Sequence, residues 1–364
     1  MKEEIRLMKG NEVVAEAAVR AGCDGFFGYP ITPQTEIMET LMELKPWETT
    51  GMVVLQAESE VASINMLYGG AAAGKRVMTS SSSPGISLMC EGISYLASAE
   101  LPCVIVDVMR GGPGLGTIQP SQSDYFQVVK GGGHGDYKLI VLAPASVQEM
   151  YDFVETAFEL AFKYRTPVVI LSDGLIGQMM ERVTLREAKP RMTDAYIAEH
   201  YGDWALTGRK DGRRRNIVTS VRLDPHVMEG VNDRLQEKYR RIERDEVRYE
   251  TFMTDDCDYL FVAYGSSARI CRKAVDMARS EGIKVGLLRP ITLFPFPSEA
   301  IASIASHCKG AMSVEMSAGQ MVEDVRLAVN DRIPVRHFGR MGGAVHSPEE
   351  VFGAFKEMLI NQKR

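Results

Sequence analysis

The sequence predicts an α/β protein, with a doubly wound parallel sheet followed by a second, smaller α/β unit. Short apolar runs alternate with helix-like stretches through the first 185 residues. The same alternation restarts near Tyr259, after an interval of different composition. A chain of 364 residues also exceeds one ordinary core. Strand–helix alternation is typical of parallel sheets that carry helices on both faces.

The first unit is expected to span residues 1–185. Its apolar runs are rich in Val, Ile or Phe and are bounded by Gly, Pro, Ser or Asp, as buried strands are. The predicted strands are Gly25–Gly28, Met52–Gln56, Arg76–Ser80, Cys103–Met109, Leu139–Leu142 and Pro167–Ser172. The predicted helices are Pro33–Leu44, Glu58–Ala73, Ile86–Ala99 and Val147–Tyr164.

A charged linker over residues 186–256 is expected to lead into a second domain over 257–364. Within the linker, apolar residues recur at helical spacing, which predicts one amphipathic connector helix. They are Val227, Val231, Leu235, Tyr239 and Ile242. The second domain's predicted strands are Tyr259–Tyr264, Lys284–Leu288, Ala311–Glu315 and Val335–Phe338, with helices Ala268–Ser280 and Gln320–Val329.

Composition excludes several classes of protein. The net charge of -6, without a long basic run, gives no reason to expect nucleic acid as a partner. No secretory signal opens the sequence and no run approaches the ~20 apolar residues of a membrane helix, so we expect a cytoplasmic protein. None of the six cysteines forms a Cys-x-x-Cys pair. We therefore expect buried thiols in a reducing compartment, and no metal site on this chain.

Polar residues follow the predicted strands at their carboxyl ends, where open α/β sheets bind ligands. Thr32 is expected to cap a helix that begins at Pro33, with its hydroxyl proton left for a substrate oxygen. Glu58 suits a first helical turn, whereas Glu60 lies beside small and apolar residues and needs a partner. The turn around Ser83 either holds a polar ligand or caps the next helix.

Arg110 ends the apolar run that precedes it and is a candidate carboxylate anchor, because its planar fork matches two carboxylate oxygens. The alternative is a salt bridge to a neighbouring acid. The density of polar residues and glycines from Gln119 to Asp136 indicates a loop shaped around a ligand.

Together these motifs resemble the α subunits of 2-oxoacid:ferredoxin oxidoreductases, over nearly the whole chain. The motifs are Tyr29-Pro-Ile-Thr-Pro33, Glu58-Ser-Glu60 with the Gly69–Gly74 run, Ser82-Ser-Pro-Gly85, Arg110-Gly-Gly-Pro-Gly114, Thr166–Asp173, Arg289–Pro297 and Val314–Gln320. Gly116–Gln122 and Gly131–Tyr137 are most similar to the 2-oxoisovalerate branch. The resemblance implies a thiamine-diphosphate-binding sheet domain and a domain like the transketolase C-terminal domain.

The resemblance also implies roles for individual residues. In this family a glutamate hydrogen-bonds the aminopyrimidine ring of thiamine diphosphate and promotes loss of the thiazolium C2 proton, and Glu60 is at that position. The catalytic residues implied are Glu60, Arg110 and Thr32. Tyr29, Pro30, Glu60 and Ser83 are the implied cofactor contacts, and Ile31, Thr32, Arg110 and Gln122 the implied substrate contacts.

The sequence contains only half of such a site. It has no Gly-Asp-Gly motif with a downstream asparagine for the metal that holds the diphosphate, and no cluster-binding cysteine set. We therefore expect a β subunit with the diphosphate and Mg²⁺, a ferredoxin-like γ or δ subunit with iron–sulfur clusters, coenzyme A as co-substrate and ferredoxin as electron acceptor. Alone, the chain is expected to be an inactive homodimer or larger.

Three alternatives stay open. A nicotinamide-dependent dehydrogenase fits the α/β pattern, but no Gly-x-Gly-x-x-Gly motif follows the first strand. A non-catalytic assembly scaffold is a second alternative. A third is 2-oxoglutarate as substrate; we favour 2-oxoisovalerate, because Gly28–Leu44 and Gly111–Val129 contain no Lys or Arg for a second carboxylate. Ile31, Leu115 and Ile118 are instead expected to line an apolar pocket.

Overall fold

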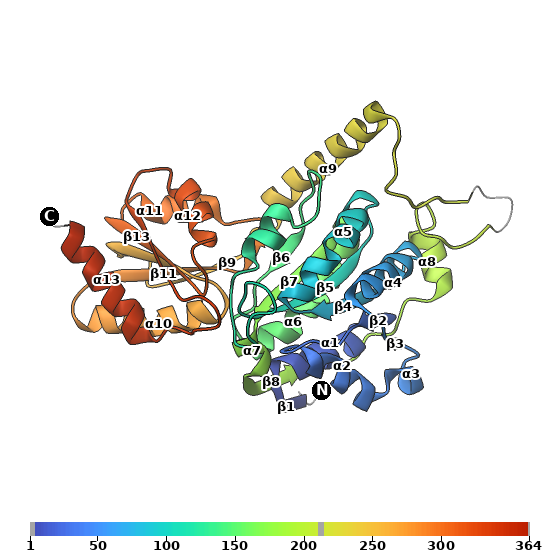
Figure 1. The fold of residues 1–364 in the computed structure, drawn as a ribbon, viewed down its shortest axis with the longest axis horizontal. Helices are drawn as coiled ribbons and strands as arrows, with labels where there is room; N and C mark the ends of the chain where they lie inside the picture. Colours follow the sequence, from blue (N-terminus) through green and yellow to red (C-terminus); the bar gives the residue numbers. More distant parts are fainter. Residues whose placement is uncertain (1–3, 210–214, 363–364) are drawn as a thin grey trace.

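The computed structural model describes residues 4–209 and 215–362 and folds them into two α/β units (Figure 1). The larger unit contains a seven-stranded sheet and the smaller unit a five-stranded sheet. Among the helices in these ranges, none combines the length and the apolar character needed to cross a membrane.

The seven-stranded sheet has the order β12-β6-β7-β5-β4-β2-β3 and is parallel except between β12 and β6. Its strands are β2 (Gly25–Gly28), β3 (Val53–Gln56), β4 (Val77–Ser81), β5 (Cys103–Met109), β6 (Ile140–Leu142), β7 (Pro167–Asp173) and β12 (Thr292–Phe294). The strands predicted for this unit are present to within one residue at either end. For β5, β6 and β7 the reason is that they are buried throughout and largely apolar, as strands of a sheet covered on both faces are.

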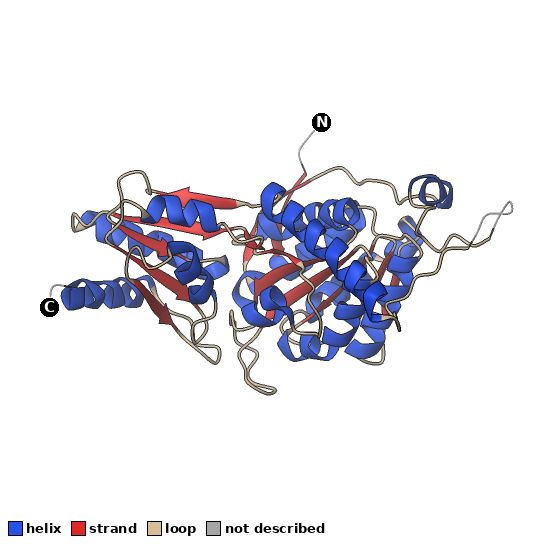
Figure 2. Ribbon diagram, turned by 90° about the horizontal axis from the view of Figure 1, so that it is seen from above, coloured by secondary structure: helices blue, strands red, loops and turns tan. Residues whose placement is uncertain are grey.

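Helices cover both faces of this sheet (Figure 2). One face carries α1 (Gly10–Arg20), α2 (Thr35–Leu44) and α6 (Val147–Tyr164), and the other carries α4 (Glu60–Ala72) and α5 (Ser83–Ser98). Since parallel strands are joined by right-handed crossovers, helices that lead in opposite directions along the sheet lie on opposite faces. The shorter helices are α3 (Pro46–Thr49) and α7 (Gly174–Gln178), and η1 (Phe126–Gly131) is a π-helical turn.

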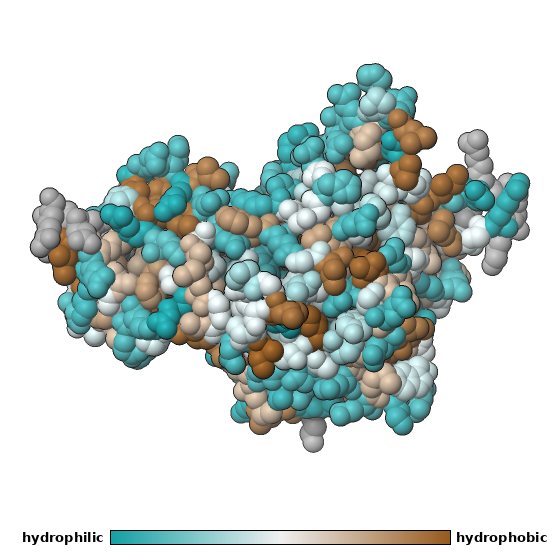
Figure 3. Space-filling model, in the orientation of Figure 1, coloured by the Kyte–Doolittle hydropathy of each residue, from teal (hydrophilic) through white to brown (hydrophobic). Residues whose placement is uncertain are grey.

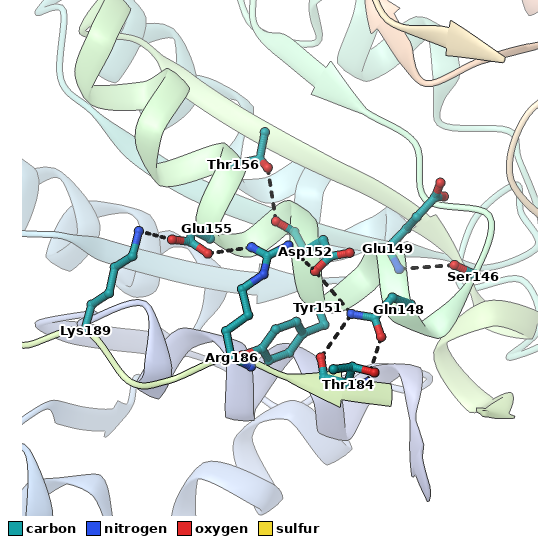
Figure 4. Close-up of polar contacts among 10 residues, drawn as sticks. All are labelled: Ser146, Gln148, Glu149, Tyr151, Asp152, Glu155, Thr156, Thr184, Arg186 and Lys189. Atoms are coloured by element: carbon teal, nitrogen blue, oxygen red, sulfur yellow. Dashed lines mark hydrogen bonds and ion pairs between the residues drawn. The ribbon is translucent and has the colours of Figure 1, made fainter. Parts of the chain in front are cut away.

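The start of the linker is fixed to α6 by polar contacts (Figure 4). The Gln148 side chain accepts from the Thr184 backbone N–H at 2.8 Å and donates to the Thr184 carbonyl at 3.2 Å. Arg186 pairs with Asp152 and Glu155, each at 2.7 Å. Nearby, β8 (Met180–Leu185) pairs antiparallel with β1 (Glu4–Lys9) in a two-stranded sheet. These contacts therefore fix the end of the first unit, residues 180–186, to α6 and β1.

The amphipathic helix expected in the linker is α9 (Pro225–Asp245), which follows α8 (Asp194–His200). The predicted stripe is buried from Val231 to Ile242, but Val227 is 52% exposed and lies outside the contact. Lys238 is buried although charged, because its ammonium group donates to Glu100 at 3.2 Å and to the Arg165 carbonyl at 3.0 Å. The helix thus lies on the first unit and leads into the second sheet.

The five-stranded sheet has the order β14-β13-β10-β11-β9, with only β9 antiparallel to its neighbour. Its strands are β9 (Tyr249–Phe252), β10 (Tyr259–Val262), β11 (Val285–Pro290), β13 (Gly310–Glu315) and β14 (Val335–Gly339). The helices α10 (Gly265–Ser280) and α13 (Pro348–Gln362) cover one face, where Phe355 contacts the rings of Tyr259 and Phe261.

The opposite face of this sheet, with α11 (Ser298–Ala305) and α12 (Met321–Val329), joins the core of the larger unit. Leu260 of β10, Leu288 of β11 and Val325 of α12 belong to that same buried cluster. Strand β12 pairs with β6 of the larger unit, although it lies within the second domain predicted over residues 257–364. The two units therefore share one continuous core, and the boundaries at 185 and 256 stay predictions.

Candidate active site

The candidate site lies at the carboxyl ends of four neighbouring strands, β5, β4, β2 and β3. Arg110 follows β5, Ser83 follows β4, Thr32 follows β2 and Glu60 follows β3. The helices after the adjacent strands β2 and β4 lie on opposite faces of the sheet, so the loops between them diverge. Open α/β sheets bind ligands at such a switch point.

Glu60 is the first residue of α4, whose N-cap is Ser59, which accepts from the Ala62 N–H at 3.2 Å. Its side chain is 6% exposed, yet no residue in the described ranges forms a hydrogen bond or an ion pair with its carboxylate. A Cβ on Gly85 would lie 2.8 Å from Glu60 Oε1, so glycine is required for this close approach. Glu58 is exposed. Glu60 is therefore buried and Glu58 is in contact with solvent, as the sequence predicts.

Arg110 is 8% exposed and is held by two backbone carbonyls. Nη1 donates to the Thr32 carbonyl at 2.9 Å and Nη2 to the Leu115 carbonyl at 2.9 Å, whereas Nε is buried without a partner. The salt bridge weighed as an alternative is not formed with any acid of the described residues. A buried guanidinium without an acid favours an anionic ligand, because an uncompensated buried charge is costly.

The Tyr29–Pro33 loop departs from one prediction. Helix α2 begins at Thr35 rather than Pro33, its N-cap is Gln34, and the Thr32–Pro33 peptide is cis. Thr32 is therefore not a helix cap; it is exposed at the site, and its carbonyl holds Arg110. Gln34 supports the loop from below, because it donates to the Tyr29 carbonyl at 3.2 Å.

The side chains of Tyr29, Pro30 and Ile31 are half-buried at this loop, next to Thr32. The predicted cofactor contacts of Tyr29 and Pro30 and the predicted substrate contact of Ile31 stay predictions.

Ser83 serves the framework of the site. Its hydroxyl donates to Asp124, lies 3.2 Å from the Arg110 carbonyl and accepts from the Arg110 backbone N–H at 3.0 Å. These contacts occupy the hydroxyl, so the expected contact to a cofactor is not supported. Ser83 instead fixes the backbone that carries the guanidinium.

Asp107 of β5 is a residue that the sequence reasoning missed. It is fully buried, and as an ionised acid it finds no donor. Burial raises the pKa of Asp107 well above its ordinary value, and the neighbouring Asp124 raises it further. Burial also raises the pKa of Asp124, to about 6. Both raised pKa values favour the protonated form of these buried acids. The sequence does contain a signal for this residue, because Asp107 is the one carboxyl in the otherwise apolar run of β5.

Gln122 is a correction to the expected substrate contacts. Its fully buried amide donates to the Tyr264 carbonyl at 2.9 Å and accepts from Ser267 Oγ at 2.6 Å and from the Met316 N–H at 3.0 Å. All three partners belong to the second unit. Gln122 therefore joins the two units, and this contact depends on long-range packing that no local pattern reveals.

The loop after Arg110 does not enclose the predicted apolar pocket. Leu115 is 82% exposed and Ile118 is 57% exposed. The loop folds back on itself, because the Gly111 N–H donates to the Gln119 carbonyl at 2.9 Å. A Cβ on Gly111 would lie 2.6 Å from Gly343 N, so glycine is required there. The apolar side chains thus lie at the surface beside the site.

The residues present fit one half of thiamine diphosphate. A ring nitrogen of the aminopyrimidine needs a carboxylate, and Glu60 is a buried carboxylate without a partner among the described residues. The diphosphate needs a metal with oxygen ligands. Within the described ranges, the one group of potential metal ligands within reach of each other lies in the second unit and consists of two cysteines and a histidine. When bound, the cofactor supplies the nucleophilic carbon and the electron sink.

The fold and this site place the chain in the class of thiamine-diphosphate-binding α/β proteins. Residues 16–237 match the thiamine-diphosphate-binding domain of pyruvate flavodoxin/ferredoxin oxidoreductases, and residues 257–351 match core domain II of pyruvate:ferredoxin oxidoreductase. The chain belongs to the 2-oxoacid:ferredoxin oxidoreductase family. The resemblance read from the motifs is confirmed.

Two curated relatives cover almost the whole chain. The ketoisovalerate oxidoreductase subunit VorB of Methanothermobacter thermautotrophicus is 53% identical over 97% of both chains. The 2-oxoglutarate synthase subunit KorA of Archaeoglobus fulgidus is 38% identical over 93% of this chain and 96% of its own. The matches therefore span nearly the full length of both relatives.

Solved structures confirm the predicted fold class. The 2-oxoglutarate:ferredoxin oxidoreductase from Magnetococcus marinus, with 2-oxoglutarate, coenzyme A and succinyl-CoA bound, superposes with a TM-score of 0.83 at 26% identity. The match covers 98% of this chain and 65% of that longer chain. A split-gene transketolase at 15% identity shares the fold alone, with a TM-score of 0.61.

Proposed function

We propose that this chain is the α subunit of an enzyme that oxidatively decarboxylates branched-chain 2-oxoacids such as 2-oxoisovalerate. The oxoacid and coenzyme A give the acyl-CoA and carbon dioxide. The electrons released pass to ferredoxin. One observation carries the proposal: Glu60 and Arg110 are buried charged groups without a counter-charge in the described residues, at the ligand-binding edge of the sheet. The identity of 53% to a ketoisovalerate oxidoreductase subunit supports it.

Each residue of the half-site has a defined task in this proposal. Glu60 hydrogen-bonds a ring nitrogen of the aminopyrimidine and so favours the proton-accepting form of that ring. Arg110 binds the carboxylate next to the reacting carbon, because its two carbonyl contacts leave three of its five N–H groups free. Thr32 offers its exposed hydroxyl to a substrate oxygen while its carbonyl positions the guanidinium.

A β subunit completes the site by contributing the diphosphate-binding half and Mg²⁺. The outer faces of α4 and α5 support this part of the proposal, because Glu91 is their only charged residue apart from the buried Glu60. Val61, Met66 and Leu88 are exposed on these helices. Depletion of charge with exposed apolar side chains is typical of interface cores. A ferredoxin-like subunit with iron–sulfur clusters then carries the electrons, and the isolated chain is an inactive homodimer or larger.

The substrate preference follows from the surroundings of Arg110. A second carboxylate, as in 2-oxoglutarate, needs a cation or several donors once it leaves water. Neither Gly28–Leu44 nor Gly111–Val129 contains Lys or Arg. The exposed Leu115 and Ile118 suit a branched alkyl group once a partner covers them. The relatives that are 2-oxoglutarate synthase subunits, at 36–38% identity, make 2-oxoglutarate the second candidate.

The test is reduction of a viologen dye by the chain alone and by the chain co-expressed with its partner subunits. We expect no turnover alone and 2-oxoacid- and coenzyme-A-dependent turnover in the assembled enzyme. The values of kcat/KM for 2-oxoisovalerate, pyruvate and 2-oxoglutarate then decide the substrate. A few methyl groups discriminate by about 1–3 kcal/mol each, so related branched oxoacids are expected to react. Turnover by the chain alone, or a clear preference for 2-oxoglutarate, contradicts the proposal.

A further inference from the structure

Three side chains without a role in the proposed function gather at the amino-terminal end of the second sheet. Cys257 lies two residues before β10, and Cys308 lies two residues before β13. The two strands are parallel neighbours, with Tyr259 opposite Gly310. The Lys309 N–H donates to the Asp258 carbonyl at 2.7 Å, so the same register continues ahead of the strands. The register therefore places the two cysteines side by side.

The distances within this cluster suit a bound metal ion. The sulfur atoms of Cys257 and Cys308 are 3.5 Å apart. A ring nitrogen of His307 lies within 4.8 Å of each of them. In a tetrahedral zinc site with Zn–S bonds of about 2.3 Å, the two sulfurs lie roughly 3.8 Å apart. Both thiols are free and buried, whereas His307 is exposed and leaves a path to solvent.

We propose that Cys257, Cys308 and His307 form a binding site for a soft divalent transition-metal ion, with Zn²⁺ the best fit, and that water takes the fourth position. Two thiolates with one imidazole select Zn²⁺ over Mg²⁺ or Ca²⁺, which prefer oxygen ligands. The ion ties the start of β10 to the start of β13, across 51 residues of sequence. The sequence predicts no metal site, because no Cys-x-x-Cys pair is present. That prediction considers only cysteines close in sequence and does not consider two that strand pairing brings together.

The site is distinct from the candidate active site. Glu60 and Arg110 lie at the carboxyl ends of the first sheet, whereas the cysteine pair lies at the amino-terminal ends of β10 and β13 in the second. Metal binding here therefore stabilises the second unit and is independent of thiamine diphosphate. By mass action, an ion that binds only the folded chain raises the midpoint of thermal unfolding.

The test is titration of the full chain with Zn²⁺ and Co²⁺ after chelator treatment under reducing conditions. We expect one equivalent of Zn²⁺ bound, a raised midpoint of thermal unfolding and a thiolate-to-Co²⁺ charge-transfer band. Cys257→Ser and Cys308→Ser should abolish all three. His307→Ala changes an exposed side chain, so it should fold normally and weaken binding by roughly 100-fold, because even outer-shell changes cost 10–100-fold.

Cys271→Ala is the matched control, since Cys271 is a fully buried cysteine of the same unit and is not a member of the cluster. It should retain one equivalent of Zn²⁺ and the Co²⁺ band. Failure of the unmodified chain to bind Zn²⁺ would overturn the proposal. So would full binding by the folded His307→Ala variant, because the ion would then be held elsewhere.

Discussion

Glu60 and Glu315 are two buried glutamates beside helix N-termini, one in each unit, and their surroundings are opposite. Glu315, at the end of β13, accepts from the N–H groups of Gln320, Met321 and Val322 at 2.9 to 3.0 Å. Two serine hydroxyls add further hydrogen bonds to it. Glu60 has no such partner in the described residues.

The same contrast separates two buried arginines. Arg289 forms a two-pronged ion pair with Glu149 at 2.6 and 2.7 Å and also donates to Glu250 at 3.1 Å. Arg110 has two carbonyls and no acid among the described residues. A buried charge that the chain itself satisfies contributes to stability, whereas one that it leaves unsatisfied indicates a site for another molecule.

The largest effect is expected for Glu60→Gln. The assembled enzyme should lose activity by ~10²–10⁴-fold, because an amide cannot support the proton shift in the aminopyrimidine. Its free energy of unfolding should not fall, since the carboxylate holds nothing within the chain and an unpaired buried charge is costly. Turnover assays and denaturant unfolding measure the two quantities. Glu58→Gln is the control, and near-normal turnover by Glu60→Gln would favour the non-catalytic scaffold.

Glu315→Gln should show the reverse pattern. The amide loses charge-assisted hydrogen bonds to three backbone N–H groups, each worth about 1.5–3 kcal/mol, so the chain should be destabilised by at least that amount. Denaturant unfolding measures the loss, and the folded, assembled fraction should keep its KM for the oxoacid. An unchanged free energy of unfolding would break the comparison between the two glutamates.

Arg110→Lys should raise KM for the oxoacid by roughly 10- to 100-fold, because an ammonium group loses the planar fork and its charge-assisted hydrogen bonds. Arg289→Lys is the matched control: it should lower the midpoint of thermal unfolding and leave KM unchanged, since Arg289 already has its acids. If both variants raised KM equally, the lack of an acid partner at Arg110 would not explain its effect on oxoacid binding.

The smallest effect concerns the pair of Asp107 and Asp124. The folded-state pKa values of both are raised, to about 6 for Asp124, so the protonated form is favoured in the folded chain. Their contribution to stability is full below the unfolded-state pKa of about 3.9 and is lost as pH rises through the folded-state values. Asp107→Asn should flatten the decline in unfolding free energy from about pH 4 to 7. Unfolding curves at several pH values measure it, and an unaltered pH dependence would contradict the raised pKa of Asp107.

Much of this protein follows from its sequence alone. Buried strands such as β5 have the predicted bounds because a largely apolar run between a proline and an arginine is a local signal. Helix α9 follows from apolar residues at helical spacing. The order of the loops also predicts that Glu60 and Arg110 lie at one edge of the sheet, because all strands of a parallel sheet end at the same edge. The difference between Glu58 and Glu60 came from the residues around each.

Only the tertiary structure decided which polar groups are satisfied. Gln122 is occupied by the second unit, Ser83 by Asp124, and the helix expected to follow Thr32 begins two residues later. The pairing of β12 with β6, and of Cys257 with Cys308, depends on strand register across long stretches of sequence. Sequence periodicity reports only neighbours within a few residues, whereas hydrogen-bond partners are set by which strands and helices pack together in space.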